Sequence, residues 1–345
     1  MKDKKQEKAA ANMPKGIDAV VGIDVANSTI KVWSENGESR NYRNTVKEVN
    51  DAGLVYSFKT DYHMYVFENQ VFEVGDISAM GRGARGSARY GSKGFRVEAI
   101  IGITSILKAG PRKRLRVVTG VPSFLAKNNK VLEDVKNSLI GSYSVKSVFW
   151  DKVEDIEFDI VEVLVVPQPL GTLYTYLCDA NGKIDMKKVE QKALVIDIGW
   201  GTTDIAILES GRVRSTFGFE TGTSDYISAI QEEVNNEIPE ANIQAVNPHE
   251  LDLKLLESPK VETPFGTFDL SPYIEKNKED QAAKIVQEVM TLGLEFNKFY
   301  KIILTGGGSL LYSKYLIEKF NDPRVIVQEG PVLANCKGFF LIGKQ

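Results

Sequence analysis

Two apolar runs, each followed by a small polar turn and a second apolar run, are the clearest periodic feature of the 345-residue chain. The first pair spans residues 18–25 and 29–34, and the second pair spans 193–198 and 203–209. Short apolar runs separated by turn residues are typical of β-hairpins. We therefore expect one hairpin near the start of each half of the chain.

The remaining pattern adds strands and helices in the same order in both halves. In residues 280–296, apolar side chains recur every three or four positions, which predicts a helix that packs one face inward. Strand, strand, strand, helix, strand in each half predicts an α/β fold with mixed sheets flanked by helices. No element is predicted in the polar stretch 240–278. Further strands are expected at 53–59, 64–68, 114–119, 212–217 and 301–305, and further helices near 95–108, 123–140 and 223–237.

The two hairpin turns carry the same eight-residue pattern. Residues 24–31 and 197–204 each begin with an aspartate and pass through small residues to a threonine. Backbone N–H groups of such a turn can converge on phosphate oxygens, and a carboxylate can hold the water shell of Mg²⁺. The repeat favours two phosphate-binding turns over two ordinary hairpins. Hydroxyl donors are available from Ser28, Thr29, Thr202 and Thr203.

Glycines also stand where two predicted helices begin. Gly306, Gly307 and Gly308 follow the strand 301–305 and precede Ser309 and a helical pattern through Tyr312. Glycines at such a turn let the main chain approach a phosphate or a flat ligand, such as a nucleotide base. A glycine-rich loop without a ligand is the alternative. Gly222 and Thr223, at the start of the helix 223–237, suit a ribose or phosphate contact equally as well as a simple helix cap.

Taken together, the two turns and the segment 304–309 resemble the actin, Hsp70 and sugar kinase superfamily of nucleotide-binding proteins. Residues 117–122, Val-Val-Thr-Gly-Val-Pro, resemble a strand end of the bacterial ParM/StbA plasmid-segregation actins. The ending Ala-Asn-Cys-Lys-Gly-Phe at 334–339 is similar to that of ParM-like and Alp-type actins. The resemblance covers roughly residues 17–343. It implies two ribonuclease H-like α/β domains around a cleft that holds a nucleotide and Mg²⁺.

The resemblance also implies a domain organisation. Residues 1–15 are expected to form a flexible tail. Domain I is expected at 16–190, with a smaller insert at about 40–110, and is completed by the C-terminal segment 328–345. Domain II is expected at 191–327.

The same resemblance assigns roles to individual residues. Asp24 and Asp197 would hold Mg²⁺ through water, and Lys31 would neutralise phosphate charge. Gln168 would orient the attacking water, where ParM usually has glutamate; the alternative is a loop residue between two prolines. Ala26 stands where most family loops have glycine. The implied nucleotide contacts are Asn27, Ser28, Thr29, Lys31, Gly199, Trp200, Gly201, Thr202, Thr203, Gly222, Thr223, Gly306, Gly307, Gly308, Ser309 and Tyr312.

The function that this resemblance implies is that of a cytoplasmic ATPase, or GTPase, which polymerises in its nucleotide-bound state and segregates plasmid DNA. Its partners would be further copies of the chain and a DNA-binding adaptor of the ParR type. A sugar or acyl kinase on the same fold is one alternative, although no second carboxylate motif stands out as its base. A nucleotide-binding scaffold without turnover is another.

Composition narrows these possibilities. A net charge of −3 and a pI near 5.7 argue against direct binding to nucleic acid, which needs concentrated Lys and Arg. Cys178 and Cys336 form no disulfide framework and fit a reducing cytoplasm, and His63 and His249 are too isolated to form a metal cluster. No apolar run approaches the roughly 20 residues of a membrane-spanning helix.

One basic segment is left without a role. Residues 81–96 contain five basic residues, no acidic residue and a formal G-x-G-x-x-G. That motif indicates a dinucleotide site only where it closes an apolar strand, and residues 76–80 do not read as such a strand. The segment is interpreted either as a solvated loop or as a contact to a neighbouring subunit in a filament or to DNA.

Overall fold

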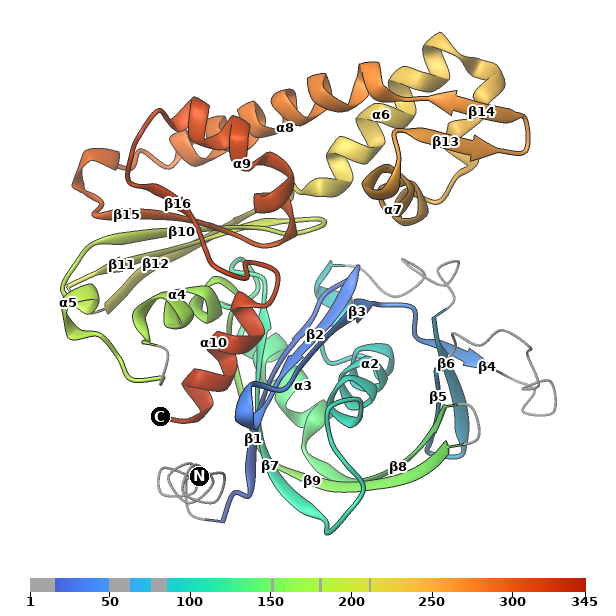
Figure 1. Ribbon diagram of the computed structural model, residues 1–345. Helices are drawn as coiled ribbons and strands as arrows, with labels where there is room; N and C mark the ends of the chain where they lie inside the picture. Colours follow the sequence, from blue (N-terminus) through green and yellow to red (C-terminus); the bar gives the residue numbers. More distant parts are fainter. Residues whose placement is uncertain (1–15, 50–62, 76–85, 150–151, 180–181, 211) are drawn as a thin grey trace. The chain divides into compact units, whose positions relative to one another are not determined.

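A computed structural model describes residues 16–49, 63–75, 86–149, 152–179, 182–210 and 212–345 (Figure 1). The expected tail 1–15 and the expected strand 53–59 lie outside the described residues, as do residues 76–80. The chain divides into two compact units, Met1–Thr175 with Asn335–Gln345, and Tyr176–Ala334. The sequence analysis places the first boundary after residue 190, where the structure has it after Thr175. It places the second boundary before residue 328, where the structure has it before Asn335.

Unit 1 is built on a nine-stranded mixed sheet with the order β3-β2-β1-β7-β9-β8-β5-β6-β4. Within this sheet, β1 pairs antiparallel with β2 and parallel with β7. The sheet curves around helix α2 (Figure 1). The strands are β1 (Ala19–Val25), β2 (Thr29–Trp33), β3 (Ser39–Arg43), β4 (Lys47–Val49), β5 (His63–Phe67), β6 (Gln70–Val74), β7 (Lys113–Val121), β8 (Gly141–Phe149) and β9 (Lys152–Pro167). The helices are α2 (Lys93–Thr104), α3 (Asn129–Leu139) and α10 (Ala334–Gly343), with α4 (Pro169–Leu177) at the boundary to unit 2.

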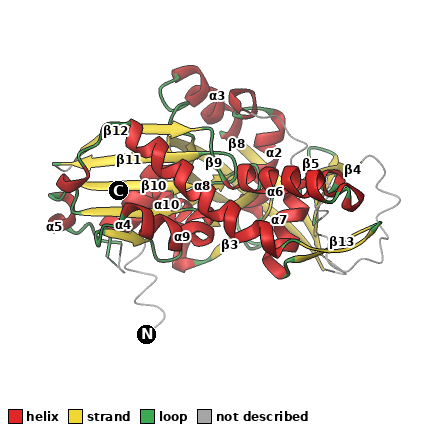
Figure 2. Ribbon diagram, turned by 90° about the horizontal axis from the view of Figure 1, so that it is seen from above, coloured by secondary structure: helices red, strands yellow, loops and turns green. Residues whose placement is uncertain are grey.

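Unit 2 is built on a five-stranded sheet with the order β12-β11-β10-β15-β16. Helices α8 and α9 cover one face of this sheet (Figures 1 and 2). The strands are β10 (Ala193–Ile198), β11 (Thr203–Glu209), β12 (Arg212–Phe219), β15 (Lys301–Thr305) and β16 (Val325–Val327), with a separate hairpin of β13 (Lys260–Thr263) and β14 (Gly266–Asp269). The helices are α5 (Met186–Val189), α6 (Thr223–Glu237), α7 (Pro248–Glu257), α8 (Ser271–Thr291) and α9 (Gly307–Phe320).

The two sheets share one strand order. In unit 1, β3-β2-β1-β7-β9 repeats the order of β12-β11-β10-β15-β16 in unit 2. The middle strand of these five is β1 in unit 1 and β10 in unit 2. Each pairs antiparallel with the strand that follows it in the chain, β2 or β11, and parallel with β7 or β15. Both central strands are buried at every position, as expected for strands covered on both faces. This arrangement confirms the predicted α/β fold with mixed sheets flanked by helices.

Several elements differ from the sequence prediction. The long hairpin of β8 and β9 was not predicted, although Ile156, Phe158 and Ile160 alternate with acidic residues and are buried in β9. The polar stretch 240–278 contains α7, β13, β14 and the start of α8. The prediction that a helix spans 280–296 was wrong at both ends: α8 begins at residue 271 and stops at residue 291, because Gly293 adopts a left-handed φ of 63°.

Candidate nucleotide-binding turns

The first turn is held by the pairing of β1 and β2. The Ala26 N–H donates to the Thr29 carbonyl at 2.9 Å and closes the turn. The β1–β2 register places Asp24 opposite Lys31, and the Lys31 ammonium lies 3.0 Å from Asp24 Oδ2. Ala26 has no positive φ, so alanine fits this turn without backbone strain.

Gln168 reaches the same aspartate from the far end of β9. Its Nε2 donates to Asp24 Oδ1 at 3.1 Å, and its side chain is 9% exposed. Its backbone N–H donates to the Val121 carbonyl at 2.9 Å. Asp24, 2% exposed, therefore accepts from Lys31 and Gln168 on different oxygens. Three residues that the sequence predicted for the site are thus brought together within unit 1.

The C-terminal helix α10 supports Gln168 from behind. A Cβ added to Gly120 would lie 2.5 Å from Phe339 Cζ and 2.9 Å from Gln168 Cγ, so both side chains pack on this glycine. Next to it, a Cβ added to Gly338 would lie 1.6 Å from the Gly171 carbonyl oxygen. The Asn335 side-chain oxygen accepts from the Thr172 backbone N–H at 3.1 Å and from its hydroxyl at 3.0 Å. The Ala-Asn-x-x-Gly-Phe ending is therefore a packing motif beneath Gln168.

Cys336 lies in the same buried layer. Burial, and to a smaller extent the negative charge of Asp24, raises the pKa of its thiol far above the ordinary value. The thiol stays protonated and acts as a small apolar group. Cys178 is also buried and forms no disulfide.

The second turn repeats the geometry of the first with different partners. The Gly199 N–H donates to the Thr202 carbonyl at 2.8 Å. The register places Asp197 opposite Asp204, and the Thr202 hydroxyl donates to Asp204 Oδ2 at 3.0 Å. Where the first turn pairs its aspartate with a lysine, the second turn therefore has a second carboxylate. The sequence analysis did not single out Asp204, although it ends the repeated pattern.

The N-termini of helices α6 and α9 contact this second turn. Gly306 has a φ of 79°, and a Cβ there would lie 2.5 Å from Asp197 Oδ1; only glycine fits this position without strain. At the start of α6, the Thr223 and Ser224 N–H groups donate to the Gly199 and Trp200 carbonyls at 3.0 and 2.8 Å. The predicted residues of both helix starts therefore lie against the turn.

Two glycines around the second turn have free space beside their Cα atoms. A Cβ added to Gly201 or Gly307 would meet no atom within 4 Å. Of the residues predicted in the first turn, Asn27 is exposed, Thr29 is partly buried and Ser28 is 7% exposed. Asn27 and Gly307 are therefore the exposed positions among these residues, and Ser28 is buried.

Three of the predicted nucleotide contacts, Thr203, Ser309 and Tyr312, have side chains with 0% exposure. The Thr203 hydroxyl donates to the Thr221 carbonyl at 2.8 Å, and the Ser309 hydroxyl donates to the Gly306 carbonyl at 2.7 Å. Tyr312 is 0% exposed and belongs to the apolar core of unit 2. Burial raises the pKa of Tyr312 well above its usual range. α9 begins at Gly307, so Tyr312 lies in its second turn, where its side chain packs inward.

Trp200 points toward α7. Its ring stacks on His249, with centroids 4.1 Å apart and planes 24° from parallel. His249 is 5% exposed and lies in the first turn of α7. One face of the indole is therefore covered by protein. The sequence analysis had no signal for this pair, because His249 lies in the polar stretch to which no element was assigned.

Arg89, in the basic segment 81–96, is a third residue that the sequence analysis missed, after Asp204 and His249. It is 4% exposed, and its guanidinium donates to the Val25 and Ala26 carbonyls of the first turn. Residues 81–85 lie outside the described part of the chain. The interpretation of the segment as a solvated loop or a filament contact is therefore wrong for Arg89.

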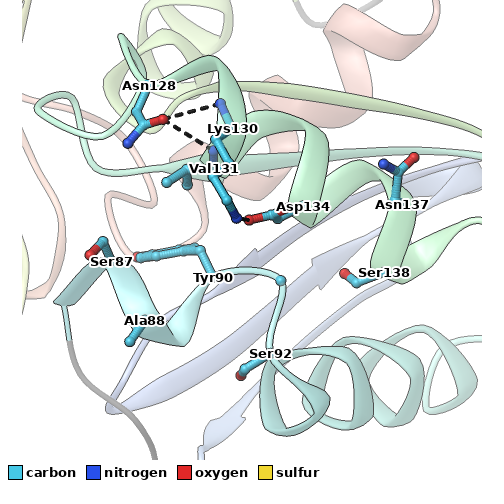
Figure 3. A pocket seen from close by; sticks show the side chains of 11 residues that line it. Ser87, Ala88, Tyr90, Ser92, Asn128, Lys130, Val131, Asp134, Asn137 and Ser138 are labelled. Atoms are coloured by element: carbon cyan, nitrogen blue, oxygen red, sulfur yellow. Dashed lines mark hydrogen bonds and ion pairs between the residues drawn. The ribbon is translucent and has the colours of Figure 1, made fainter.

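A pocket of about 670 Å³ in unit 1 lies apart from the turns. It lies between the segment before α2 and the face of α3 (Figure 3). Its lining includes three Ser, two Asn and the ion pair Lys130–Asp134 at 2.6 Å. The Asn128 side chain accepts from the Lys130 and Val131 N–H groups and caps α3 (Figure 3). None of the predicted site residues lines this pocket.

Within the described ranges, no group of three or more His, Cys, Asp or Glu side chains gathers to hold a metal ion. Mg²⁺ needs no such cluster, because it keeps several waters and takes one or two carboxylates together with substrate phosphates. Asp24 and Asp197 fit that chemistry. Among the helices of the described residues, none is long and apolar enough to cross a membrane.

Two models of known protein families together match most of the chain. Residues 22–171 match the family model of the N-terminal domain of actin like proteins, and residues 195–318 match that of the C-terminal part of the archaeal actin homologue MreB-like. No curated protein sequence matches significantly. These two matches together span most of the chain and support the actin-like part of the resemblance.

Solved structures agree on the fold. A ParM filament of 15 strands from Clostridium botulinum aligns with a TM-score of 0.75 at 18% identity, over 95% of this chain and 99% of that chain. The actin-like protein Alp7A aligns with a TM-score of 0.71 at 14% identity, over 94% and 95%. The archaeal actin homologue Ta0583 in complex with ADP aligns with a TM-score of 0.69 at 19% identity, over 93% and 98%.

Proposed function

The chain belongs to the actin-like proteins, and we propose that it binds and hydrolyses ATP, or GTP, and that this reaction controls its assembly into filaments. The observation that carries the proposal is the duplicated hairpin. Two sheets of one strand order each present a turn that begins with a buried aspartate. In unit 1 that aspartate holds Lys31 and Gln168.

The proposed roles follow from these contacts. The exposed main chain of the two turns binds the phosphates, and Lys31 balances their charge. Gln168 orients the attacking water through its amide. In phosphoryl transfer the protein acts mainly by positioning and electrostatics, so a neutral amide held on Asp24 suits this role.

Asp24 and Asp197 are the proposed holders of Mg²⁺, through water. The metal would supply charge neutralisation on the phosphates. Both oxygens of Asp24 already accept one hydrogen bond, and each has a further lone pair for a water. We expect Asp197→Ala to abolish hydrolysis and nucleotide-dependent light scattering. Normal filaments from this variant would contradict the magnesium assignment.

We propose self-association because a protein of this fold, the ParM of Clostridium botulinum, forms a filament of 15 strands. A cytoplasmic role in plasmid segregation, through a DNA-binding adaptor of the ParR type, is the finer part of the proposal. The net charge of −3 supports an adaptor rather than direct DNA contact.

Electron microscopy of the purified protein with and without Mg-ATP or Mg-GTP tests the proposal. Filaments that depend on nucleotide support it, and particles that stay monomeric in every nucleotide contradict the filament role. Phosphate release without an acceptor molecule separates an ATPase from a sugar or acyl kinase. Nucleotide binding without phosphate release would favour a scaffold.

Gln168→Ala tests the catalytic assignment separately. We expect filaments to form and phosphate release to slow by about 10²-fold, the effect of losing the orientation of one reactant. Gln70→Ala is the matched control, because Gln70 donates to Glu48 at the exposed edge of unit 1. If Gln168→Ala turns over like this control, Gln168 has no part in the mechanism.

A further inference from the structure

A buried ion pair lies directly beneath the first turn. Arg89 ends the short 3₁₀ turn Gly86–Arg89, and Glu98 lies in α2. The two guanidinium nitrogens meet the two carboxylate oxygens, with Nη2 to Oε2 at 2.6 Å and Nη1 to Oε1 at 3.3 Å. The side chains are 4% and 12% exposed. This two-point contact fixes the plane of the guanidinium.

The Arg89 guanidinium also donates hydrogen bonds to backbone carbonyls of the first turn. Arg89 Nη2 donates to the Val25 carbonyl at 3.3 Å and to the Ala26 carbonyl at 3.2 Å. The Asn44 amide donates to the Ala26 carbonyl as well, at 3.0 Å. Both lone pairs of the Ala26 oxygen are therefore used by side chains from outside the hairpin.

These contacts also set the direction of an N–H group. A trans peptide is planar, so the carbonyl of one residue and the N–H of the next point in opposite directions. With the Ala26 carbonyl drawn toward Arg89 and Asn44, the Asn27 N–H points away from them. The preceding N–H, of Ala26, is used inside the turn by Thr29. Asn27 is exposed, so its N–H is presented at the open side of the turn.

Stability alone does not account for the buried Arg89–Glu98 ion pair. The cost of removing two charges from water often exceeds their attraction, and well-packed apolar replacements are frequently as stable. Arg89 Nε, in addition, has no hydrogen-bond partner among the described residues. A positive group fixed beneath a turn that binds anions gives such a reason, because it orients a donor and adds a favourable potential.

We propose that Arg89 is a positioning residue of the first phosphate-binding turn: it fixes the Ala26–Asn27 peptide so that the Asn27 N–H meets a nucleotide phosphate. Glu98 fixes Arg89, and Asn44 assists at the same carbonyl. This inference rests on the proposed nucleotide binding. It gives Arg89 of the basic segment a role at the nucleotide site.

The test separates positioning from stability. Arg89→Met alone leaves Glu98 buried without its partner and is expected to destabilise the fold. The double variant Arg89→Met/Glu98→Met removes both charges, and we expect its urea midpoint to return toward that of the wild type. We expect its Kd for Mg-ATP to rise at least tenfold, while binding of adenosine, which has no phosphate, changes less than twofold.

Two further variants keep the test decisive if the double variant does not fold. Asn44→Ala removes one donor to the Ala26 carbonyl and leaves Arg89 in place, so Mg-ATP binding should weaken in the same direction by a smaller factor. Glu98→Gln keeps one acceptor for the guanidinium but replaces the other with an amide N–H, so the two-point contact that fixes Arg89 is lost. Mg-ATP binding should therefore weaken in this variant too, by a smaller factor than in the double variant. A folded double variant that binds Mg-ATP like the wild type overturns the proposal. If Asn44→Ala binds Mg-ATP unchanged, the proposal is overturned as well.

Failure of the proposed function gives a different result. If the wild type itself binds neither ATP nor GTP, nucleotide binding is wrong as a function. The positioning claim is then tested in the nucleotide-free protein, by the NMR shift of the Asn27 amide. A shift in the double variant supports the claim, and an unchanged Asn27 amide overturns it.

Discussion

Gly338→Ala tests how closely α10 must pack beneath Gln168. An added Cβ would lie 1.6 Å from the Gly171 carbonyl oxygen, whereas ordinary contact begins at 3.4 Å. Helices α10 and α4 must therefore separate by about 1.8 Å at this point. Such a shift exceeds what the hydrogen bonds from Thr172 to Asn335, at 3.1 and 3.0 Å, can absorb.

The expected loss of stability follows from three contributions. Overpacking a well-packed site costs about 1–3 kcal/mol, and leaving the buried Thr172 donors without their acceptor costs about 1–3 kcal/mol more. Alanine gains about 1 kcal/mol over glycine in a helix. We therefore expect a net destabilisation of about 1–5 kcal/mol. Because Phe339 and Gln168 share the surface of Gly120, phosphate release should slow as well.

Urea unfolding, followed by circular dichroism without nucleotide, measures this effect. Gly307→Ala is the matched control, since Gly307 is also a helical glycine but an added Cβ meets nothing within 4 Å. We expect the control to be neutral or stabilised by up to about 1 kcal/mol, and the midpoint of Gly338→Ala to fall by about 1 M. Equal midpoints for the two variants would refute the packing argument.

Three other predictions test separate parts of the molecule. Asn335→Ala removes the acceptor of both Thr172 donors, so unfolding should become easier by about 1–3 kcal/mol; Asn335→Asp, which keeps an acceptor, should lose less, and equal losses would contradict this account. His249→Ala uncovers one face of the Trp200 indole, so emission should shift to longer wavelength, whereas His249→Phe should keep the wild-type spectrum; identical spectra for both would exclude the stack. Burial against Tyr65 and Phe149 lowers the pKa of His63 below 6.5, so the folded state favours the neutral ring and its contribution to stability should be lost as the pH falls from 6.5 through the folded pKa. A urea midpoint that falls equally between pH 7.5 and 5.5 in the wild type and in His63→Phe would contradict this.

Local pattern predicted the hairpins, because they form from neighbours in sequence. The strands 193–198 and 203–209 and the small residues between them appear in the structure as β10, β11 and their turn. The repeat of 24–31 in 197–204 also predicted that the two units share one architecture, and the common strand order confirms it. The alternation in β9 was equally readable and was overlooked.

The partners of the turns were decided only by the tertiary structure. Gln168 and Asp24 are 144 positions apart, and their contact depends on the parallel pairing of β7 with β1 and β9. The burial of Arg89 is likewise invisible in a segment rich in Gly and Arg, because its carboxylate and carbonyl partners come from α2 and β1. Hydrophobic periodicity and turn chemistry act between neighbours and fix the elements themselves. Which polar side chains share a buried site depends on sheet order and register, and these are set by contacts between distant parts of the chain.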